Sequence, residues 1–140
     1  MKNISSTAIL ASLVWIVLST NSNAQQVGIN PRDQKMTPYM ERYNRNKPVM
    51  VAPTLRQEKS TYFNGVLTNV YTEVTRTAAE LAPMNLSETQ RPFIFPEICK
   101  TSDTGRMLRE GSSFRYLYYG NDGKLAGQLI ITPADCASVR

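Results

Sequence analysis

Histidine does not occur anywhere in this sequence. Because imidazole is the commonest general base and the commonest metal ligand in proteins, its absence excludes Ser-His-Asp triads and histidine-bearing zinc sites. The sequence also lacks the C-x-x-C spacing of a redox catalyst, a glycine-rich phosphate loop and a dinucleotide-binding fingerprint. We therefore expect a protein that is not an enzyme and that carries no metal and no cofactor.

Long apolar runs are scarce, and the one that stands out lies at the N-terminus. Lys2 precedes an apolar run from Ala8 to Leu18, and Ser22-Asn23-Ala24 follows it. The run is well short of the roughly 20 residues that a spanning helix needs, and the small-x-small triplet is typical of a cleavage site. We predict a signal peptide at residues 1–24 with cleavage between Ala24 and Gln25, no lipid attachment, no transmembrane segment in the mature form, and a periplasmic or secreted product.

Cysteine is rare, with two residues in the chain. Cys99 and Cys136 form an even pair in an exported sequence, where disulfides form and persist. Closing the loop between them stabilises the fold by about 3–4 kcal/mol if the gain is the lost entropy of the unfolded chain. We predict one disulfide, and two buried free thiols are the alternative.

Basic charge is concentrated near the start of the mature chain. Residues 25–59 contain seven Lys or Arg against three Asp or Glu, whereas residues 60–140 contain eight of each. Residues 25–46 show no sustained apolar periodicity, so they cannot bury enough surface to offset the entropy cost of ordering. We predict a flexible basic arm at residues 25–46, which either orders on a partner or is an idle solvated leader.

The remaining residues, 47–140, are enough for a single domain. Asn64-Gly65 is the dipeptide most typical of a tight hairpin turn, and β-branched and apolar residues flank it. We predict strands near 55–63 and 66–75. A helix that starts at Asn69 and runs through Leu81 is the rival for the second half, because Ala and Glu favour helices.

Two short helices are predicted after this hairpin. A capping-box pattern indicates a helix that starts at Glu88. Pro92 and Pro96 each remove a backbone donor, so we expect this helix to be short or kinked. A second helix is predicted near 104–110, with Gly111 in the position that ends helices.

The clearest local pattern is a hairpin at the C-terminus. Residues 114–119 and 125–132 alternate around the turn sequence Gly120-Asn121-Asp122-Gly123. Six residues are expected to face the helices: Phe114, Tyr116, Tyr118, Leu125, Leu129 and Ile131. The predicted fold class is α+β, a small antiparallel sheet of two hairpins with one or two short helices on one face.

Several short segments of this chain are informative when they are considered as a set. They are Pro48–Val51, Thr54–Leu55, Leu67–Thr68, Tyr71–Thr72, Cys99, Leu108, Gly111, Tyr116, Tyr118, Asp122–Lys124 and Thr132–Cys136. With them, residues 46–136 resemble a group of small exported proteins of Gram-negative bacteria for which no activity is established. The most specific part is the hairpin that ends in Thr-Pro-Ala-Asp-Cys. The resemblance implies an α+β fold and paired cysteines, and a more regular helix than Pro92 and Pro96 allow here.

Carboxylates are the remaining candidates for catalysis. They are Asp103, Glu110, Asp122 and Asp135. Each has an ordinary structural role available, Asp103 as a helix cap, Asp122 in a turn and Glu110 as a surface charge at a helix end. A small secreted effector or hydrolase that uses two of them is therefore kept as the alternative function.

One face of the C-terminal hairpin is the candidate binding surface. Arg115, Leu117 and Tyr119 point away from the predicted core, and Tyr and Arg are enriched at binding hot spots. The domain is electrically balanced beyond residue 59, so we expect no nucleic acid as a partner. We predict a non-catalytic periplasmic protein-interaction module whose partner is another envelope protein. It would be an accessory component of a secretion or conjugation system, or an inhibitor or immunity protein.

Overall fold

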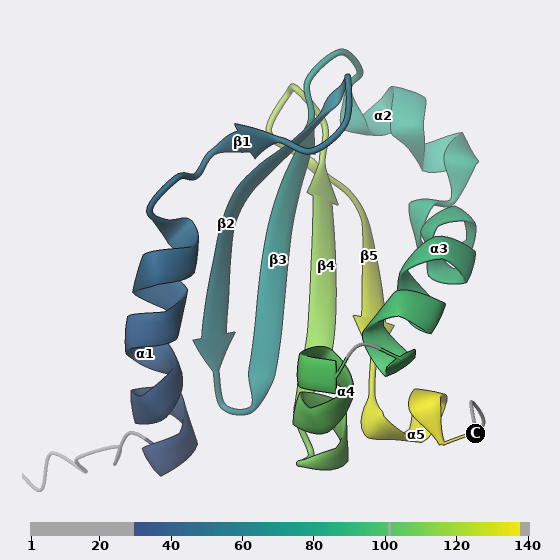
Figure 1. The fold of residues 1–140 in the computed structure, drawn as a ribbon. Helices are drawn as coiled ribbons and strands as arrows, with labels where there is room; N and C mark the ends of the chain where they lie inside the picture. Colours follow the sequence, from purple (N-terminus) through teal and green to yellow (C-terminus); the bar gives the residue numbers. More distant parts are fainter. Residues whose placement is uncertain (1–29, 101, 138–140) are drawn as a thin grey trace, which may run out of the picture.

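The computed structural model describes residues 30–100 and 102–137. The predicted signal peptide and its cleavage site lie outside these residues. The fold is α+β, as predicted, with one sheet of five strands in the order β1-β2-β3-β4-β5 (Figure 1). The strands are β1 (Val49–Met50), β2 (Leu55–Phe63), β3 (Val66–Glu73), β4 (Ser113–Tyr119) and β5 (Leu125–Ile131). Neighbours pair antiparallel except β3 and β4, which are parallel.

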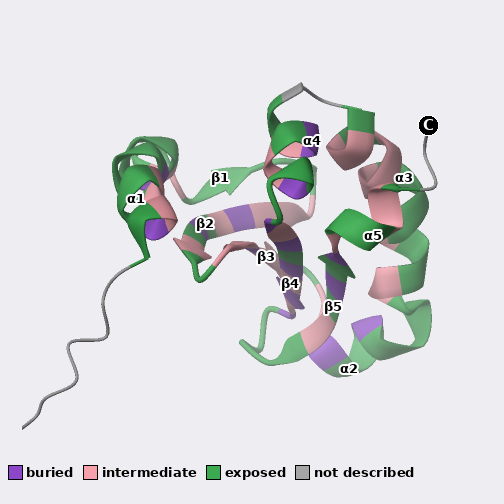
Figure 2. Ribbon diagram, turned by 90° about the horizontal axis from the view of Figure 1, so that it is seen from below, coloured by how far each residue is buried: buried purple, intermediate pink, exposed green. Residues whose placement is uncertain are grey.

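The parallel pair requires a crossover, and four helical segments supply it. They are α2 (Ala78–Leu81), the 3₁₀ turn η1 (Ala82–Met84), α3 (Leu86–Lys100) and α4 (Ser102–Arg109). Helix α1 (Pro31–Asn44) precedes the sheet and α5 (Pro133–Cys136) follows it. Helices α1, α3 and α4 lie on the same side of the sheet (Figure 2). We call this side the helical face and the other side the open face.

The first hairpin is confirmed. β2 and β3 are joined by Asn64 and Gly65, whose φ angles of 48° and 76° are those that a twisted two-residue turn requires. The rival helix from Asn69 is wrong, because β3 continues to Glu73 and the helix begins only at Ala78. Thr77 caps that helix, and Glu80 completes a capping box with it.

The predicted flexible arm is wrong over residues 31–44, which form α1. Asn30 caps this helix by accepting a hydrogen bond from the Arg32 backbone N–H at 2.9 Å. The Asn44 side chain donates to the Ser60 carbonyl at 2.6 Å and accepts from the Ser60 N–H at 2.8 Å. Helix α1 therefore covers the backbone edge of β2, and long-range contacts supply the ordering energy that the local pattern does not.

Helix α3 is longer than predicted. It begins two residues before Glu88 and continues without a break through Pro92 and Pro96. Each proline removes one helical hydrogen bond. Four side chains of α3 pack against the core and offset that loss: Leu86, Ile94, Phe95 and Ile98. The second predicted helix is confirmed as α4, and Gly111 follows it with a φ angle of 89°.

The C-terminal hairpin is confirmed, and it carries most of the core. Five of the six residues predicted to face the helices are buried: Phe114, Tyr116, Tyr118, Leu129 and Ile131. The sixth, Leu125, is 51% exposed. The pairing register shifts between Tyr118 and Tyr119, so Leu125 pairs with Tyr119 instead of continuing the buried alternation.

The predicted disulfide joins Cys99 of α3 to Cys136 of α5. The same two helices are also linked by an ion pair between Arg91 and Asp135, 3.2 Å long. Asp135 in turn accepts hydrogen bonds from the N–H and hydroxyl of Thr132, both at 2.8 Å. The segment after β5 is thus held against α3 by one covalent and one charged link.

A buried carboxylate anchors the end of β3. Glu73 is 7% exposed and accepts hydrogen bonds from Thr54 at 2.7 Å and from the hydroxyl of Thr75, and Arg76 forms an ion pair with it at 3.3 Å. Burial raises the pKa of the Glu73 carboxyl, but these hydrogen bonds outweigh burial and hold its pKa below the ordinary value. The ionised form is therefore the one that the fold stabilises.

We expect Glu73→Gln to lower the free energy of unfolding at pH 7 by about 2 kcal/mol, because the amide cannot satisfy the same donors. The stabilisation by Glu73 is complete above the unfolded-state pKa of about 4.3 and is lost as the pH falls through the lower folded-state pKa. Urea unfolding between about pH 7 and pH 3 should therefore show a weaker pH dependence for Glu73→Gln than for the native protein. Glu88→Gln, at an exposed position of α3, is the control. Equal pH dependence in the native protein and Glu73→Gln would contradict this role.

Candidate functional site

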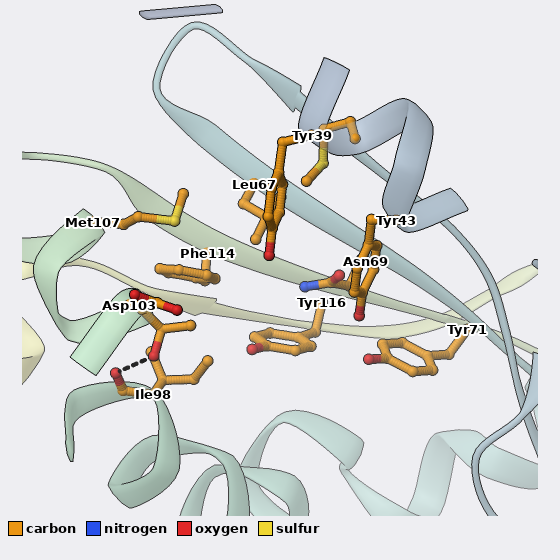
Figure 3. Close-up of a pocket in the computed structure, with 12 residues that line it drawn as sticks. Tyr39, Tyr43, Leu67, Asn69, Tyr71, Ile98, Asp103, Met107, Phe114 and Tyr116 are labelled. Atoms are coloured by element: carbon orange, nitrogen blue, oxygen red, sulfur yellow. Dashed lines mark hydrogen bonds between the residues drawn. The ribbon is translucent and has the colours of Figure 1, made fainter. Parts of the chain in front are cut away.

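Three adjoining hollows lie on the helical face of the sheet. The central one, of about 210 Å³, is bounded by α1 on one side and by α3 and α4 on the other, and β3 and β4 form its floor (Figure 3). Its neighbours have volumes of about 420 Å³ and 330 Å³. Shared lining residues connect them: Tyr39, Asp103 and Met107 join the first neighbour, and Tyr71, Ile98 and Tyr116 join the second. Together they form one trough, which we call the helical-face groove.

Aromatic rings form the floor of the groove. The Tyr71 ring stacks against Tyr116 and Tyr118, with centroids 6.3 Å and 5.6 Å apart, and Phe114 continues the row. Burial raises the pKa of Tyr71 to about 12 and raises the pKa of Tyr116 and Tyr118 as well. The phenols therefore stay neutral at physiological pH, and the floor offers apolar ring surface without charge.

The two walls of the groove come from distant parts of the chain. Helix α1 supplies Tyr39 and Tyr43, which are 51% and 43% exposed and whose rings stack with centroids 6.4 Å apart. The opposite wall is formed by Ile98 of α3 and Met107 of α4 (Figure 3). Exposed aromatic side chains above an apolar floor are typical of a surface that binds another apolar surface.

Charge distinguishes the two ends of the groove. At one end the basic residues Lys35, Arg42 and Arg106 outnumber the carboxylates Asp103 and Glu110. Arg106 pairs with Asp103 at 3.3 Å, and Lys35 and Arg42 of α1 lie without an ion-pair partner among the described residues. The other end is mostly apolar, with Phe93 74% exposed and Val51 49% exposed, and Glu97 is the one charged residue that lines it. A ligand that fits both ends would carry a carboxylate at one end of an apolar surface.

The residues of α1 were missed as site residues because residues 25–46 were predicted to be flexible. A signal was present nevertheless. Met36, Met40 and Tyr43 recur at helical spacing, and an Asn-Pro pair at residues 30–31 is a typical helix start. The pattern is weak because Pro38 lies inside the helix and most of the surrounding residues are polar.

The four carboxylates considered for catalysis are not brought together. Only Asp103 and Glu110 line a common hollow. The pKa of Asp122 is lowered by a hydrogen bond from the Ala78 N–H, and that of Asp135 is lowered by hydrogen bonds from Thr132. A general acid needs the opposite shift, so the arrangement offers no support to the carboxylate hydrolase. Within residues 30–100 and 102–137, no group of three or more Cys, Asp or Glu side chains could hold a metal ion.

The predicted binding residues Arg115, Leu117 and Tyr119 lie on the open face of β4. Their neighbours in the strand, Phe114, Tyr116 and Tyr118, are buried on the helical face. The two sets alternate along one strand, so the predicted residues do not belong to the groove. They remain a proposal for a separate surface.

Among known proteins, solved structures with a similar fold were found. No family model matches the chain. No curated protein matches it either. A candidate secreted protein from Pseudomonas aeruginosa aligns with a TM-score of 0.61 at 13% identity, over 78% of this chain and 99% of that one.

Two further structures with the same fold are type II secretion system pilotins. EpsS from Vibrio vulnificus aligns with a TM-score of 0.59 at 12% identity, over 74% of this chain and 90% of the other. AspS from Vibrio cholerae aligns with a TM-score of 0.54 at 12% identity, over 74% and 91% of the two chains. At these identities the likeness establishes the fold.

None of the helices in the described residues combines the length and the apolar character that a membrane crossing requires.

Proposed function

We propose that this protein is a non-catalytic interaction module of the Gram-negative envelope, an accessory component of a secretion system. It docks an apolar segment of another envelope protein in the helical-face groove. The signal peptide predicted at residues 1–24 delivers it to the periplasm, with cleavage between Ala24 and Gln25. The observation that carries the proposal is the groove itself, an uncharged aromatic floor between two helical walls that leave it open.

The fold supports this proposal over an inhibitor or immunity protein. Two solved proteins with this fold are pilotins of secretion systems. The basic end of the groove, near Lys35 and Arg42, adds a preference for a partner segment with a carboxylate at the corresponding end. Apolar contact along the floor would supply most of the affinity, and charge would set the direction in which the segment lies.

The double variant Tyr39→Ala/Phe93→Ala tests the groove. Both side chains are more than half exposed, so their removal should leave the fold intact. We expect the tagged native protein, crosslinked in cells of its own host, to capture an envelope protein. The double variant should capture less of this protein, by a factor of about ten or more. Mass spectrometry identifies the captured protein and quantifies it.

Phe63→Ala is the matched control. Phe63 is 72% exposed, aromatic, and lies on the open face at the end of β2. Capture should be the same for Phe63→Ala and the native protein. Undiminished capture by Tyr39→Ala/Phe93→Ala, or no captured protein with any variant, would contradict the proposed function. Circular dichroism of each variant excludes loss of fold as the cause.

A further inference from the structure

A second surface lies on the open face of the sheet. In each strand, alternate residues point away from the helices, and none of α1, α3 or α4 packs on this side (Figure 2). The register places Lys59, Val70, Leu117 and Gln128 in one row across four strands, and Thr61, Thr68, Arg115 and Ile130 in the next row. Tyr119 follows Leu117 on the same face of β4. We call Lys59, Val70, Arg115, Leu117, Tyr119 and Ile130 the open-face patch.

The centre of the patch is apolar and its margin is basic. Val70, Leu117 and Tyr119 are half-buried in the middle strands, and Ile130 on the next strand is 39% exposed. Lys59 and Arg115 are exposed and have no ion-pair or hydrogen-bond partner among the described residues. An apolar centre within a polar margin is the usual composition of a protein interface.

The charge without an ion-pair partner in these rows has one sign. Neither row contains an acidic side chain, and the nearest one in β2, Glu58 at the register shift between Gln57 and Lys59, pairs with Arg56 at 2.8 Å. Lys59 and Arg115 therefore leave an uncompensated positive charge around the apolar centre. A second copy of this chain would bring like charges together, so self-association through this face is disfavoured.

Two basic side chains without ion-pair partners are too few to bind a polyanion tightly. Nucleic-acid binding draws its affinity from many phosphate contacts, and each basic residue near an anionic lipid surface contributes only about 1 kcal/mol. The apolar strip of Val70, Leu117 and Tyr119 would face phosphate groups with no favourable contact. A protein surface satisfies both parts, because carboxylates can meet Lys59 and Arg115 while aliphatic or aromatic side chains cover the strip.

We propose that the open-face patch docks an acidic segment of a second protein, in which carboxylates flank a large apolar side chain. The patch and the helical-face groove use alternate residues of the same strand, β4, on opposite sides of the sheet. The domain is thereby an adaptor that holds two polypeptide segments at once, one on each face. This goes beyond the proposed function, which needs the groove alone.

The test uses a random-peptide display library selected on the purified native protein. The enriched peptides are then measured against two variants of the same protein. The first, Lys59→Glu/Arg115→Glu, reverses the charge of the open-face patch. The second is Tyr39→Ala/Phe93→Ala, which alters only the groove. Both pairs of side chains are exposed, and circular dichroism checks that each variant is folded.

We expect one class of enriched peptides that contains Asp or Glu around a large apolar residue. Its affinity should fall by about tenfold or more on charge reversal of the patch and should be unchanged in the groove variant. The loss should shrink as salt is raised. Peptides that depend on Tyr39 and Phe93 instead report on the groove, so the two proposals fail independently.

Three outcomes would overturn the proposal. The first is that no enriched peptide loses affinity in Lys59→Glu/Arg115→Glu. The second is that the peptides which do lose affinity carry no carboxylates. The third is that phosphatidylglycerol vesicles or a single-stranded oligonucleotide bind the patch as tightly as the peptides and with the same dependence on Lys59 and Arg115, which would make it a lipid or nucleic-acid surface.

Discussion

Replacing Gly120 by alanine lowers the free energy of unfolding by about 3 kcal/mol or more, because a side chain at this position has no space. A Cβ atom there would lie 2.2 Å from the backbone nitrogen of Ala78 and 2.5 Å from the carbonyl carbon of Thr77. Both contacts are with backbone atoms, so neither can be relieved by a change of rotamer. The β4–β5 turn and the start of α2 would have to move apart.

That movement also breaks the hydrogen bonds that join these two segments. The Asp122 side chain accepts from the Ala78 N–H at 3.1 Å, and the Asn121 N–H donates to the Arg76 carbonyl at 2.9 Å. Gly120 is thus the point where the C-terminal hairpin contacts the beginning of the crossover. Separation of the two would leave these backbone groups without their partners, among them the N–H of the buried Ala78, which adds to the steric cost.

Gly127→Ala is the matched control for Gly120→Ala. A Cβ at Gly127 would lie 3.4 Å from the Leu86 Cβ, an ordinary contact, so its stability should change by less than about 1 kcal/mol. Urea unfolding followed by far-ultraviolet circular dichroism measures both variants. Equal stability of Gly120→Ala and Gly127→Ala would show that the turn and α2 are not tightly packed.

Removal of the disulfide should lower the free energy of unfolding by an amount similar to that expected for Gly120→Ala. Cys99 and Cys136 are 37 residues apart, and the lost loop entropy of the unfolded chain corresponds to about 4 kcal/mol. We expect the double variant Cys99→Ala/Cys136→Ala to be destabilised by about this amount, a large part of the 5–15 kcal/mol typical of whole domains. Replacing both residues avoids an unpaired thiol.

A reducing agent supplies the control for the disulfide. The sequence contains no other cysteine, so dithiothreitol should lower the stability of the native protein to that of the double variant and leave the double variant unchanged. Urea midpoints with and without the reductant measure both effects. A double variant as stable as the oxidised native protein would show that non-covalent contacts, such as the ion pair between Arg91 and Asp135, are sufficient to hold α5 to α3.

Both proposed binding surfaces, the groove and the open-face patch, use residues of β4. Its alternate residues form the groove floor on one side and the patch on the other. Mutations that disturb the β4–β5 turn, such as Gly120→Ala, should therefore impair both surfaces. Surface variants such as Phe93→Ala should affect one of them.

Local patterns were sufficient for the hairpins and the disulfide. Asn64-Gly65 predicts a turn because few residues other than Gly and Asn adopt positive φ, and period-two alternation predicts which side of β4 is buried. Both depend on residues adjacent in the chain. The prediction failed at Leu125, where a register shift changes the side on which the residue lies.

The groove could not be predicted in the same way, because contacts between distant residues create it. Helix α1 is held by Asn44 on Ser60, and a chain segment rich in polar residues gives little sign of that contact. The parallel pairing of β3 with β4 brings Tyr71 beside Tyr118. The residues that flank either tyrosine in the sequence do not indicate this pairing.

The sequence by itself therefore determined the turns, the buried side of the hairpins, the cysteine pair and the absence of histidine chemistry. The tertiary structure decided that residues 31–44 fold as α1, that α3 continues through Pro92 and Pro96, and that an aromatic groove opens between them. The physical reason is that backbone conformation depends on near neighbours. The free energy that orders a weakly amphipathic or proline-containing helix comes from its packing against residues far away in the chain.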